Sequence, residues 1–183
     1  MAIDLTDDIR EKAAEIINKM KSLDIDVKFV EPKNLHITMK FLGDVSEDRV
    51  NGIEDAISGA VKALKDSGSK PFKVSVEGLG YFGVPSHIKT LWVDTGEGHE
   101  ELVKLVGAMN AALDHIRKDD RKPKPHITLG RVKSGRNREA LLKMLEEMKH
   151  VKLGEMDVKL VKLKQSVLSK EGPHYSDLKS FEL

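Results

Sequence analysis

Apolar residues recur along the chain with two different periods, and each period predicts one kind of secondary structure. Four stretches repeat an apolar residue every three to four positions, which predicts amphipathic helices over 9–20, 50–64, 102–116 and 141–148. Shorter stretches alternate apolar and polar residues, which predicts strands over 2–5, 27–30, 36–42, 72–76, 88–94, 126–132, 156–163, 165–168 and 175–181. Strands outnumber helices and no long linker separates them, so the pattern predicts an α+β fold.

Two segments between the predicted elements have a different composition. Residues 78–87 are rich in glycine and aromatic residues, which predicts a loop. Tyr81 and Phe82 in this segment either stack on a nucleobase or pack on the core, and the sequence leaves both open. Residues 169–173, Ser-Lys-Glu-Gly-Pro, predict the turn that joins the last two strands.

One short strand occurs twice in the sequence. Residues 36–39 read His-Ile-Thr-Met, and residues 126–129, ninety positions later, read His-Ile-Thr-Leu. Each copy follows a proline-containing segment and precedes a glycine and then a helical pattern. Because side chains alternate along a strand, the His and Thr of each HxT motif share one face and the aliphatic residues share the other. The duplication predicts two similar halves that place two His-Thr pairs about a cleft.

Composition and charge limit the class of protein. The chain has 183 residues, 39% of them hydrophobic, which suits one domain or two small lobes. The net charge of +1 provides no global attraction to nucleic acid, so a basic binding surface has to be local, and the run 117–124 beside the second motif is the candidate. Cysteine is absent, which excludes disulfides and thiolate metal sites. No apolar run reaches the ~18 residues of a membrane span and no signal-peptide pattern is present, so we expect a cytoplasmic protein without membrane contact.

Two histidines that face each other are suited to general acid–base catalysis near neutral pH. One imidazole removes a proton from the attacking hydroxyl or water, and the other delivers a proton to the leaving oxygen. The threonine hydroxyls can donate hydrogen bonds to the oxygens of a phosphoryl group. A metal site is the competing interpretation, but neither motif has a carboxylate or a second His at ligand spacing. For a single HxT motif, a structural histidine would be the simpler interpretation.

The residues around both motifs resemble the 2H phosphoesterase superfamily. The resemblance rests on 34–43, Asn-Leu-His-Ile-Thr-Met-Lys-Phe-Leu-Gly, and on 125–132, Pro-His-Ile-Thr-Leu-Gly-Arg-Val, with supporting matches at 2–5, 91–93 and 172–175. Within the superfamily the chain is similar to the archaeal and bacterial RNA 2′,3′-cyclic phosphodiesterases, historically called 2′-5′ RNA ligases. This resemblance implies one bilobal α+β domain over 1–183, with two pseudo-symmetric lobes of antiparallel sheet, helices outside and a central groove. Each lobe would contribute one HxT strand, around 36–38 and 126–128.

The resemblance also implies an activity and its site. It implies metal-independent hydrolysis of RNA 2′,3′-cyclic phosphate ends to 2′-phosphates without a cofactor, and reversible 2′-5′ joining of RNA ends in some members. His36 and His126 would be the acid–base pair, and Thr38 and Thr128 would orient the phosphate. RNA ends, including those of tRNA halves, would be the partners of a monomeric enzyme. The alternatives are the same chemistry on a small cyclic nucleotide or an ADP-ribose cyclic phosphate, and a noncatalytic RNA-end-binding module.

Further residues near the motifs are candidates for substrate contact. Arg131 stands where the family often has a basic residue near the phosphate, but strand alternation puts it on the face opposite His126 unless a bulge turns it. Lys40 has the alternation expected of a residue lining the groove, although a solvated lysine fits equally well. By the same alternation Phe41 is expected in the core. Tyr175 is a candidate for base stacking.

Overall fold

The computed structural model of the chain describes residues 1–119, 122–169 and 172–183, and residues 120–121 of the charged run and 170–171 of the expected turn lie outside the described residues. All four predicted helices occur in the described part. They are α1 (Asp7–Lys21), α2 (Val50–Asp66), α3 (His99–Ala112) and α4 (Arg138–Glu147), with short 3₁₀ turns η1 (Pro32–Asn34) and η2 (Glu47–Arg49). Within these ranges no helix is both long and apolar enough to span a membrane.

The described strands form a single antiparallel sheet, which confirms the predicted α+β class. They are β1 (Ala2–Asp4), β2 (Val27–Phe29), β3 (His36–Thr38), β4 (Phe72–Val84), β5 (His87–Thr95), β6 (Ile127–Val132), β7 (Lys152–Val158), β8 (Leu160–Leu168) and β9 (Pro173–Glu182). Their order is β7-β4-β5-β6-β3-β1-β8-β9, and β2 pairs with β6 beside β3. The two strands of the HxT motifs therefore lie next to each other at the middle of the sheet. Three strands continue outward on each side of them.

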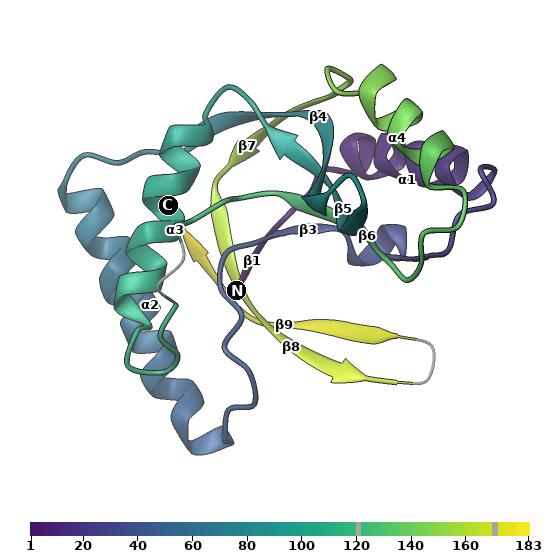
Figure 1. Cartoon of the computed structure of the whole chain (residues 1–183). Helices are drawn as coiled ribbons and strands as arrows, with labels where there is room; N and C mark the ends of the chain where they lie inside the picture. The colour runs from purple at the N-terminus through teal and green to yellow at the C-terminus, as the bar shows by residue number, and fades with distance from the viewer. Residues whose placement is uncertain (120–121, 170–171) are drawn as a thin grey trace.

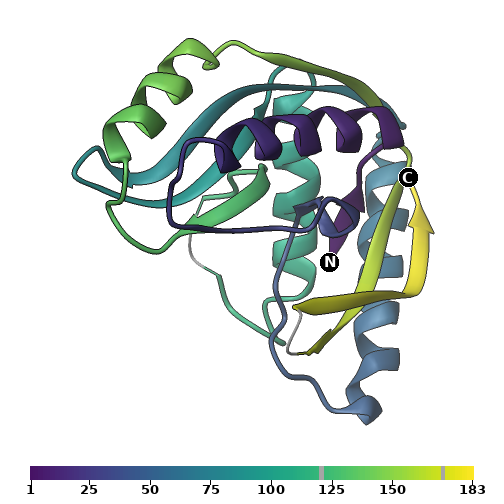
Figure 2. The same cartoon turned by 90° about the vertical axis from the view of Figure 1, so that its right-hand side faces the viewer.

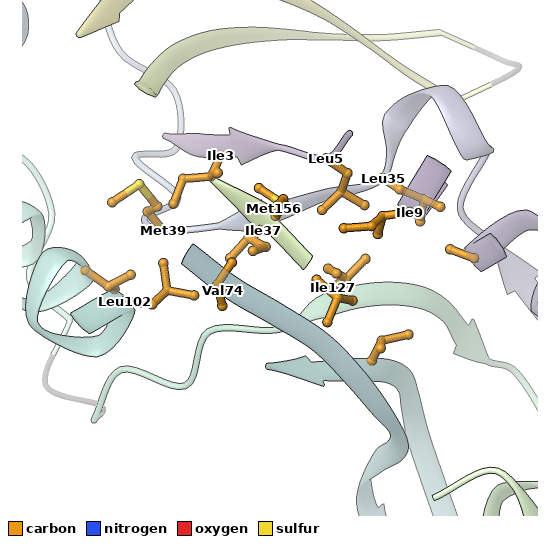
Figure 3. Close-up of a cluster of buried hydrophobic side chains, with 14 of the residues drawn as sticks. Ile3, Leu5, Ile9, Leu35, Ile37, Met39, Val74, Leu102, Ile127 and Met156 are labelled. Atoms are coloured by element: carbon orange, nitrogen blue, oxygen red, sulfur yellow. The ribbon is translucent and has the colours of Figure 1, made fainter. Parts of the chain in front are cut away.

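The helices pack on one face of this sheet in two pairs. Helix α1 contacts β7 and α4 contacts β4, whereas α2 packs against α3 and β9 (Figures 1 and 2). Helix α3 also contacts β4. The core forms where the apolar faces of the helices meet the sheet. Figure 3 shows its central part, in which Ile37 and Ile127 from the two HxT strands lie among Ile9 of α1 and Leu102 of α3.

Two predicted elements away from the HxT motifs differ from the structure. Residues 78–87, expected to be a loop, belong mostly to the long hairpin of β4 and β5, in which only Pro85 and Ser86 form the turn. Pairing with β5 overrides the weak strand preference of the glycines, and register shifts after Glu77 and Phe82 accommodate them. The single strand expected over 156–163 is two strands that meet at Lys159, and this break explains why its alternation changes phase.

Candidate active site

The two HxT motifs are held side by side by one backbone pairing. Strands β3 and β6 are antiparallel, with Ile37 opposite Ile127. Both isoleucines are fully buried in the core beneath the sheet. Because side chains alternate across a strand, the His and Thr residues of both motifs emerge on the opposite face. We call this the HxT face.

The register of this pairing brings four functional side chains together. Extending it by one residue in each direction sets His36 beside Thr128, and Thr38 beside His126. The two histidines are then diagonal neighbours, a position in which residues on paired strands lie about 7–8 Å apart. Both imidazoles project from these neighbouring positions on the HxT face. The expectation of two His-Thr pairs facing a common site thus has a direct geometric basis.

Both imidazoles are oriented by the same hydrogen bond. Nδ1 of His36 lies 2.8 Å from the carbonyl oxygen of Asn34, and Nδ1 of His126 lies 2.7 Å from that of Lys124. A carbonyl oxygen can only accept, so Nδ1–H is the donor in each case and Nε2 of the neutral ring is an available acceptor. The hydroxyl of Thr38 lies 3.0 Å from Nε2 of His36 and donates to it. Each Nε2 is therefore the ring nitrogen that is left to accept or donate a proton on the HxT face.

Burial lowers the pKa of both histidines below the ordinary value of 6.5. At His36 the carbonyl of Asn34 opposes this effect and the charge of Lys164 adds to it. At His126 the carbonyl of Lys124 and the charge of Asp94 oppose it, and the charges of Lys124 and Arg131 add to it. Lower pKa values favour the neutral imidazole, which is the form that acts as a general base.

Aromatic rings enclose His126. The ring of Phe82 meets it edge-on with centroids 4.9 Å apart, and the ring of Trp92 lies 6.4 Å away. The ammonium of Lys124 lies 4.5 Å from the Trp92 ring centroid and 5.0 Å from that of Phe82. Of the two possibilities left open for Phe82 and Tyr81, Phe82 lies beside His126, whereas Tyr81 packs against the core. Sequence reasoning missed Trp92, whose signal is that it is the only tryptophan and lies on a predicted strand.

The hairpin of β8 and β9 supplies the surroundings of His36. Tyr175 is 39% exposed, and its ring meets the His36 ring edge-on with centroids 5.2 Å apart. The side-chain amide of Asn34 donates to the carbonyl of Pro173 at 3.0 Å, which ties the same hairpin to the segment preceding β3. Pro173 pairs with Leu168 and Tyr175 pairs with Ser166, next to the turn of the hairpin, so these contacts hold the turn end of the hairpin beside the first motif. Figure 1 shows this hairpin extending from the edge of the sheet.

A network of four charges lies next to His36. Lys162 bridges Asp4 and Asp177 at 2.7 and 2.6 Å, and Lys164 bridges the same two carboxylates at 2.8 and 2.6 Å. Asp4 is paired directly with His36 across β1 and β3, so both side chains point to the HxT face. The pKa of Asp4 is raised by burial, but hydrogen bonds from the two lysines outweigh this and lower it overall. Both carboxylates stay ionised at neutral pH, and the network positions β8 against β1.

A bulge turns Arg131 toward the HxT face. Relative to β5, strand β6 carries one additional residue, Leu129, so that Thr128 pairs with Trp92 while Arg131 pairs with Thr90. Trp92 and Thr90 are two residues apart and share one face, and residues paired across antiparallel strands point the same way. Thr128 and Arg131 are therefore on the same face. The bulge that strand alternation required for Arg131 is present.

The residues after the first motif differ from their expected placement. Strand β3 ends at Thr38, so the alternation used for Lys40 and Phe41 does not apply. Lys40 is neither solvated nor free, because it is 3% exposed and its ammonium donates to the carbonyl of Asn110 at 3.2 Å. Phe41, expected in the core, is 67% exposed, and that expectation is wrong.

The cavity between α2 and α3 is separate from the HxT face. Its volume is about 170 Å³, and its lining, which includes Val61 and Leu105, contains no HxT residue. Among residues 1–119, 122–169 and 172–183, no group of three or more His, Asp or Glu side chains is arranged to hold a metal ion.

Comparison with known proteins gives consistent matches over the whole chain. The family model described as "AKAP7 2'5' RNA ligase-like domain" matches residues 2–183. A protein of Methanothermobacter thermautotrophicus named RNA 2′,3′-cyclic phosphodiesterase is 36% identical, and the alignment covers 100% of this chain and 97% of that protein. One of the same name from Archaeoglobus fulgidus is also 36% identical, with 100% and 98% covered. The crystal structure of TT0787 of Thermus thermophilus superposes with a TM-score of 0.78 at 26% identity, covering 100% of this chain and 95% of that one.

Proposed function

The chain belongs to the AKAP7 2′5′ RNA ligase-like domain family, and we propose that, like the archaeal relatives it resembles, it hydrolyses RNA 2′,3′-cyclic phosphate ends. The proposed product is the 2′-phosphate, formed by two-histidine acid–base catalysis. The residues 1–183 would act as one bilobal domain, with one HxT strand from each half. The relatives' names support the activity, and the arrangement of the HxT face supports the mechanism.

In the proposed reaction the cyclic phosphate lies between His36 and His126. The neutral imidazole takes a proton from a water molecule through Nε2 as the water oxygen forms a bond to phosphorus. The P–O3′ bond breaks, and the protonated imidazole delivers its proton from Nε2 to O3′. The imidazole that was neutral ends protonated, and the imidazole that was protonated ends neutral, so the pair as a whole gains and loses no proton. A 5′-hydroxyl in place of the water would instead yield a 2′-5′ linkage, which accounts for ligation by the same site.

The remaining site residues would stabilise the phosphate. The hydroxyls of Thr38 and Thr128 would donate to its non-bridging oxygens, and the guanidinium of Arg131 would balance the charge that develops there. Tyr175 and the Phe82–Trp92 pair would flank the terminal nucleoside. Lys40 has no place in this arrangement, because its ammonium is buried against α3.

One observation supports this proposal above the others. The antiparallel pairing of Ile37 with Ile127 places the two motifs next to each other, and each motif fixes its own imidazole through a carbonyl two residues earlier. A histidine with a purely structural role would not need a second HxT motif on the neighbouring strand. Two oriented Nε2 atoms on one face are what transfer of one proton in and one proton out requires.

The test uses a short RNA that ends in a 2′,3′-cyclic phosphate, incubated with the protein in excess EDTA. The products are separated into 2′- and 3′-phosphate ends. We expect the 2′-phosphate, which identifies O3′ as the leaving oxygen and places a dissociable metal outside the mechanism. Turnover that needs an added divalent metal would contradict the two-histidine mechanism, and a 3′-phosphate product would contradict the assignment of the leaving oxygen.

The salt dependence of RNA binding separates the polynucleotide from a small-molecule substrate. Each phosphate contact to a basic residue makes affinity fall with salt concentration. We therefore expect the affinity for an oligonucleotide to fall steeply between 50 and 200 mM salt, by about tenfold or more for several contacts. A flat response would indicate a small cyclic phosphate as the substrate, and binding without any turnover would indicate a noncatalytic module.

A further inference from the structure

Phe41 is an exposed aromatic ring with a cationic partner. Its side chain is 67% exposed, which makes it more exposed than Tyr175, the other strongly exposed aromatic residue of the described chain. The guanidinium of Arg117 lies 5.2 Å from the ring centroid. Among the described residues Arg117 has no carboxylate partner, so its charge is directed at the ring and the surrounding solvent. An exposed ring with an adjacent guanidinium is a surface on which a nucleobase can stack.

The backbone around Phe41 holds the ring in place. On one side, Lys40 is buried and its ammonium donates to the carbonyl of Asn110 at the end of α3. On the other side, Leu42 packs against the core, and Gly43 adopts a φ of +80°. A Cβ on Gly43 would lie 3.1 Å from the Arg117 guanidinium, which shows how closely the two segments approach. The chain is thus anchored on both sides of Phe41 while the ring itself is left in solvent.

The segment that carries this ring starts at one end of the HxT face. In the antiparallel pair of β3 and β6, Thr38 lies beside His126, so the segment leaving β3 and the segment leading to β6 start from the same end. Phe41 is three residues beyond Thr38, which is at most about 11 Å of extended chain. Arg117 begins the basic run that continues through Lys124, whose ammonium lies over Trp92 beside His126.

We propose that Phe41 and Arg117 form a binding site for the nucleotide on the 5′ side of the terminal cyclic phosphate nucleotide of an RNA substrate. The proposal rests on the proposed function, because a terminal cyclic phosphate held between the histidines leaves only the 5′ part of the strand to continue away from them. The base of that nucleotide stacks on Phe41, and Arg117 contacts the adjoining phosphate. Since every base has a π-face, the site selects polynucleotide ends over mononucleotides with little preference for sequence.

The experiment compares two substrates in wild-type protein and in Phe41→Ala. One substrate is a 2′,3′-cyclic mononucleotide, and the other is a trinucleotide that ends in the same cyclic phosphate. Base stacking on an aromatic ring predicts that Phe41→Ala lowers kcat/KM for the trinucleotide by about five- to a hundredfold. We expect no change for the mononucleotide. A trinucleotide that is abasic at the penultimate position should be hydrolysed equally by both proteins.

Two further variants separate stacking from general effects. Phe41→Trp keeps an aromatic face and should retain wild-type kcat/KM on the trinucleotide. Arg49→Gln removes an exposed charge from the following turn η2 and leaves every aromatic ring in place. It should leave kcat/KM for both substrates unchanged. Equal kcat/KM for wild type and Phe41→Ala on the trinucleotide would overturn the proposal, as would an equal loss on both substrates.

A binding measurement keeps this proposal distinct from the proposed function. Fluorescence anisotropy with a labelled trinucleotide that ends in a 2′-phosphate reports the contact without turnover. If wild-type protein hydrolysed neither cyclic substrate, the proposed function would fail, and the anisotropy would still decide the site. Weaker binding by Phe41→Ala then supports the site, and equal binding excludes it.

Discussion

Adding one methyl group at Gly80 should disturb the active site through Trp92. The two residues are paired across β4 and β5, and the indole lies across the glycine. A Cβ at position 80 would lie 2.4 Å from Cη2 and 2.5 Å from Cζ2 of the indole. Carbon atoms in contact are separated by about 3.5–4.0 Å, so the indole has to move by about 1 Å or more.

This displacement would reach His126, one of the two proposed catalytic histidines. Trp92 is only 9% exposed, its ring lies 6.4 Å from that of His126, and it lies under the ammonium of Lys124. Overpacking of this kind costs about 1–3 kcal/mol of folding free energy. For a chain of this size that corresponds to a fall in Tm of about 2–12 °C. A misplacement of about 1 Å at a reacting group lowers kcat by up to about 10²-fold.

The assay combines thermal unfolding with kcat/KM on a 2′,3′-cyclic nucleotide. The matched control is Gly107→Ala in α3, where a Cβ meets no atom within 4 Å. There the better helix propensity of alanine should leave Tm unchanged or raise it, by up to about 1 kcal/mol of stability. In a Trp92→Leu background, Gly80→Ala should have little further effect, because the clashing ring is gone. Wild-type Tm and kcat/KM in Gly80→Ala would refute the role assigned to the indole.

Three other predictions concern the histidines and their charges. Replacing His36 or His126 by alanine should lower kcat by about 10²–10⁴-fold with little change in Tm. As a control, replacing the exposed His87 by alanine should leave kcat unchanged. Near-normal turnover in either motif variant would contradict the mechanism. Because burial lowers the pKa of both motif histidines below 6.5, the bell-shaped pH profile of kcat/KM should have its maximum below pH 6.5, and a maximum above pH 7.5 would contradict this environment. The charge of Arg131 lowers the pKa of His126, so Arg131→Gln should reduce kcat/KM and move one limb of that profile to higher pH. Arg136→Gln, at an exposed position before α4, is the control. It should change neither kcat/KM nor the pH profile.

The periodicities of the sequence are enough to predict most of the helices and strands. Most of these elements bury one face in the core, and a buried face leaves a regular spacing of apolar residues in the sequence. The helices with apolar residues at three- and four-residue spacing all occur, and the repeated HxT strands lie together. The segment 78–87 could not be predicted in the same way. Its glycines have little local preference for a strand, and only pairing with β5 and the packing of Trp92 over Gly80 give them extended structure.

The directions of the side chains that follow Thr38 in β3 and Leu129 in β6 depend on where the regular alternation of side chains along each strand ends. Phe41 was assigned to the core by counting residues along a strand that in fact ends three positions earlier. The same counting predicts that Arg131 lies on the far face unless a bulge turns it, and the bulge at Leu129 is visible only in the register with β5. Both outcomes depend on pairing partners distant in sequence, which local pattern cannot specify.

The duplicated motifs have the same backbone pairing but unequal surroundings, and the proposed acid–base pair needs such a difference. Two imidazoles in identical environments would hold a shared proton with no preference between them. Here His36 is flanked by Tyr175 and by the Asp4 network, whereas His126 is flanked by Phe82 and the ammonium of Lys124. Burial lowers the pKa of both imidazoles, but the charged groups that act on each one are different. Different surroundings are what allow two like groups to serve as acid and base. In the proposed mechanism the repeated strand thus supplies the two imidazoles, and the unrepeated residues around it allow the two imidazoles to take different roles.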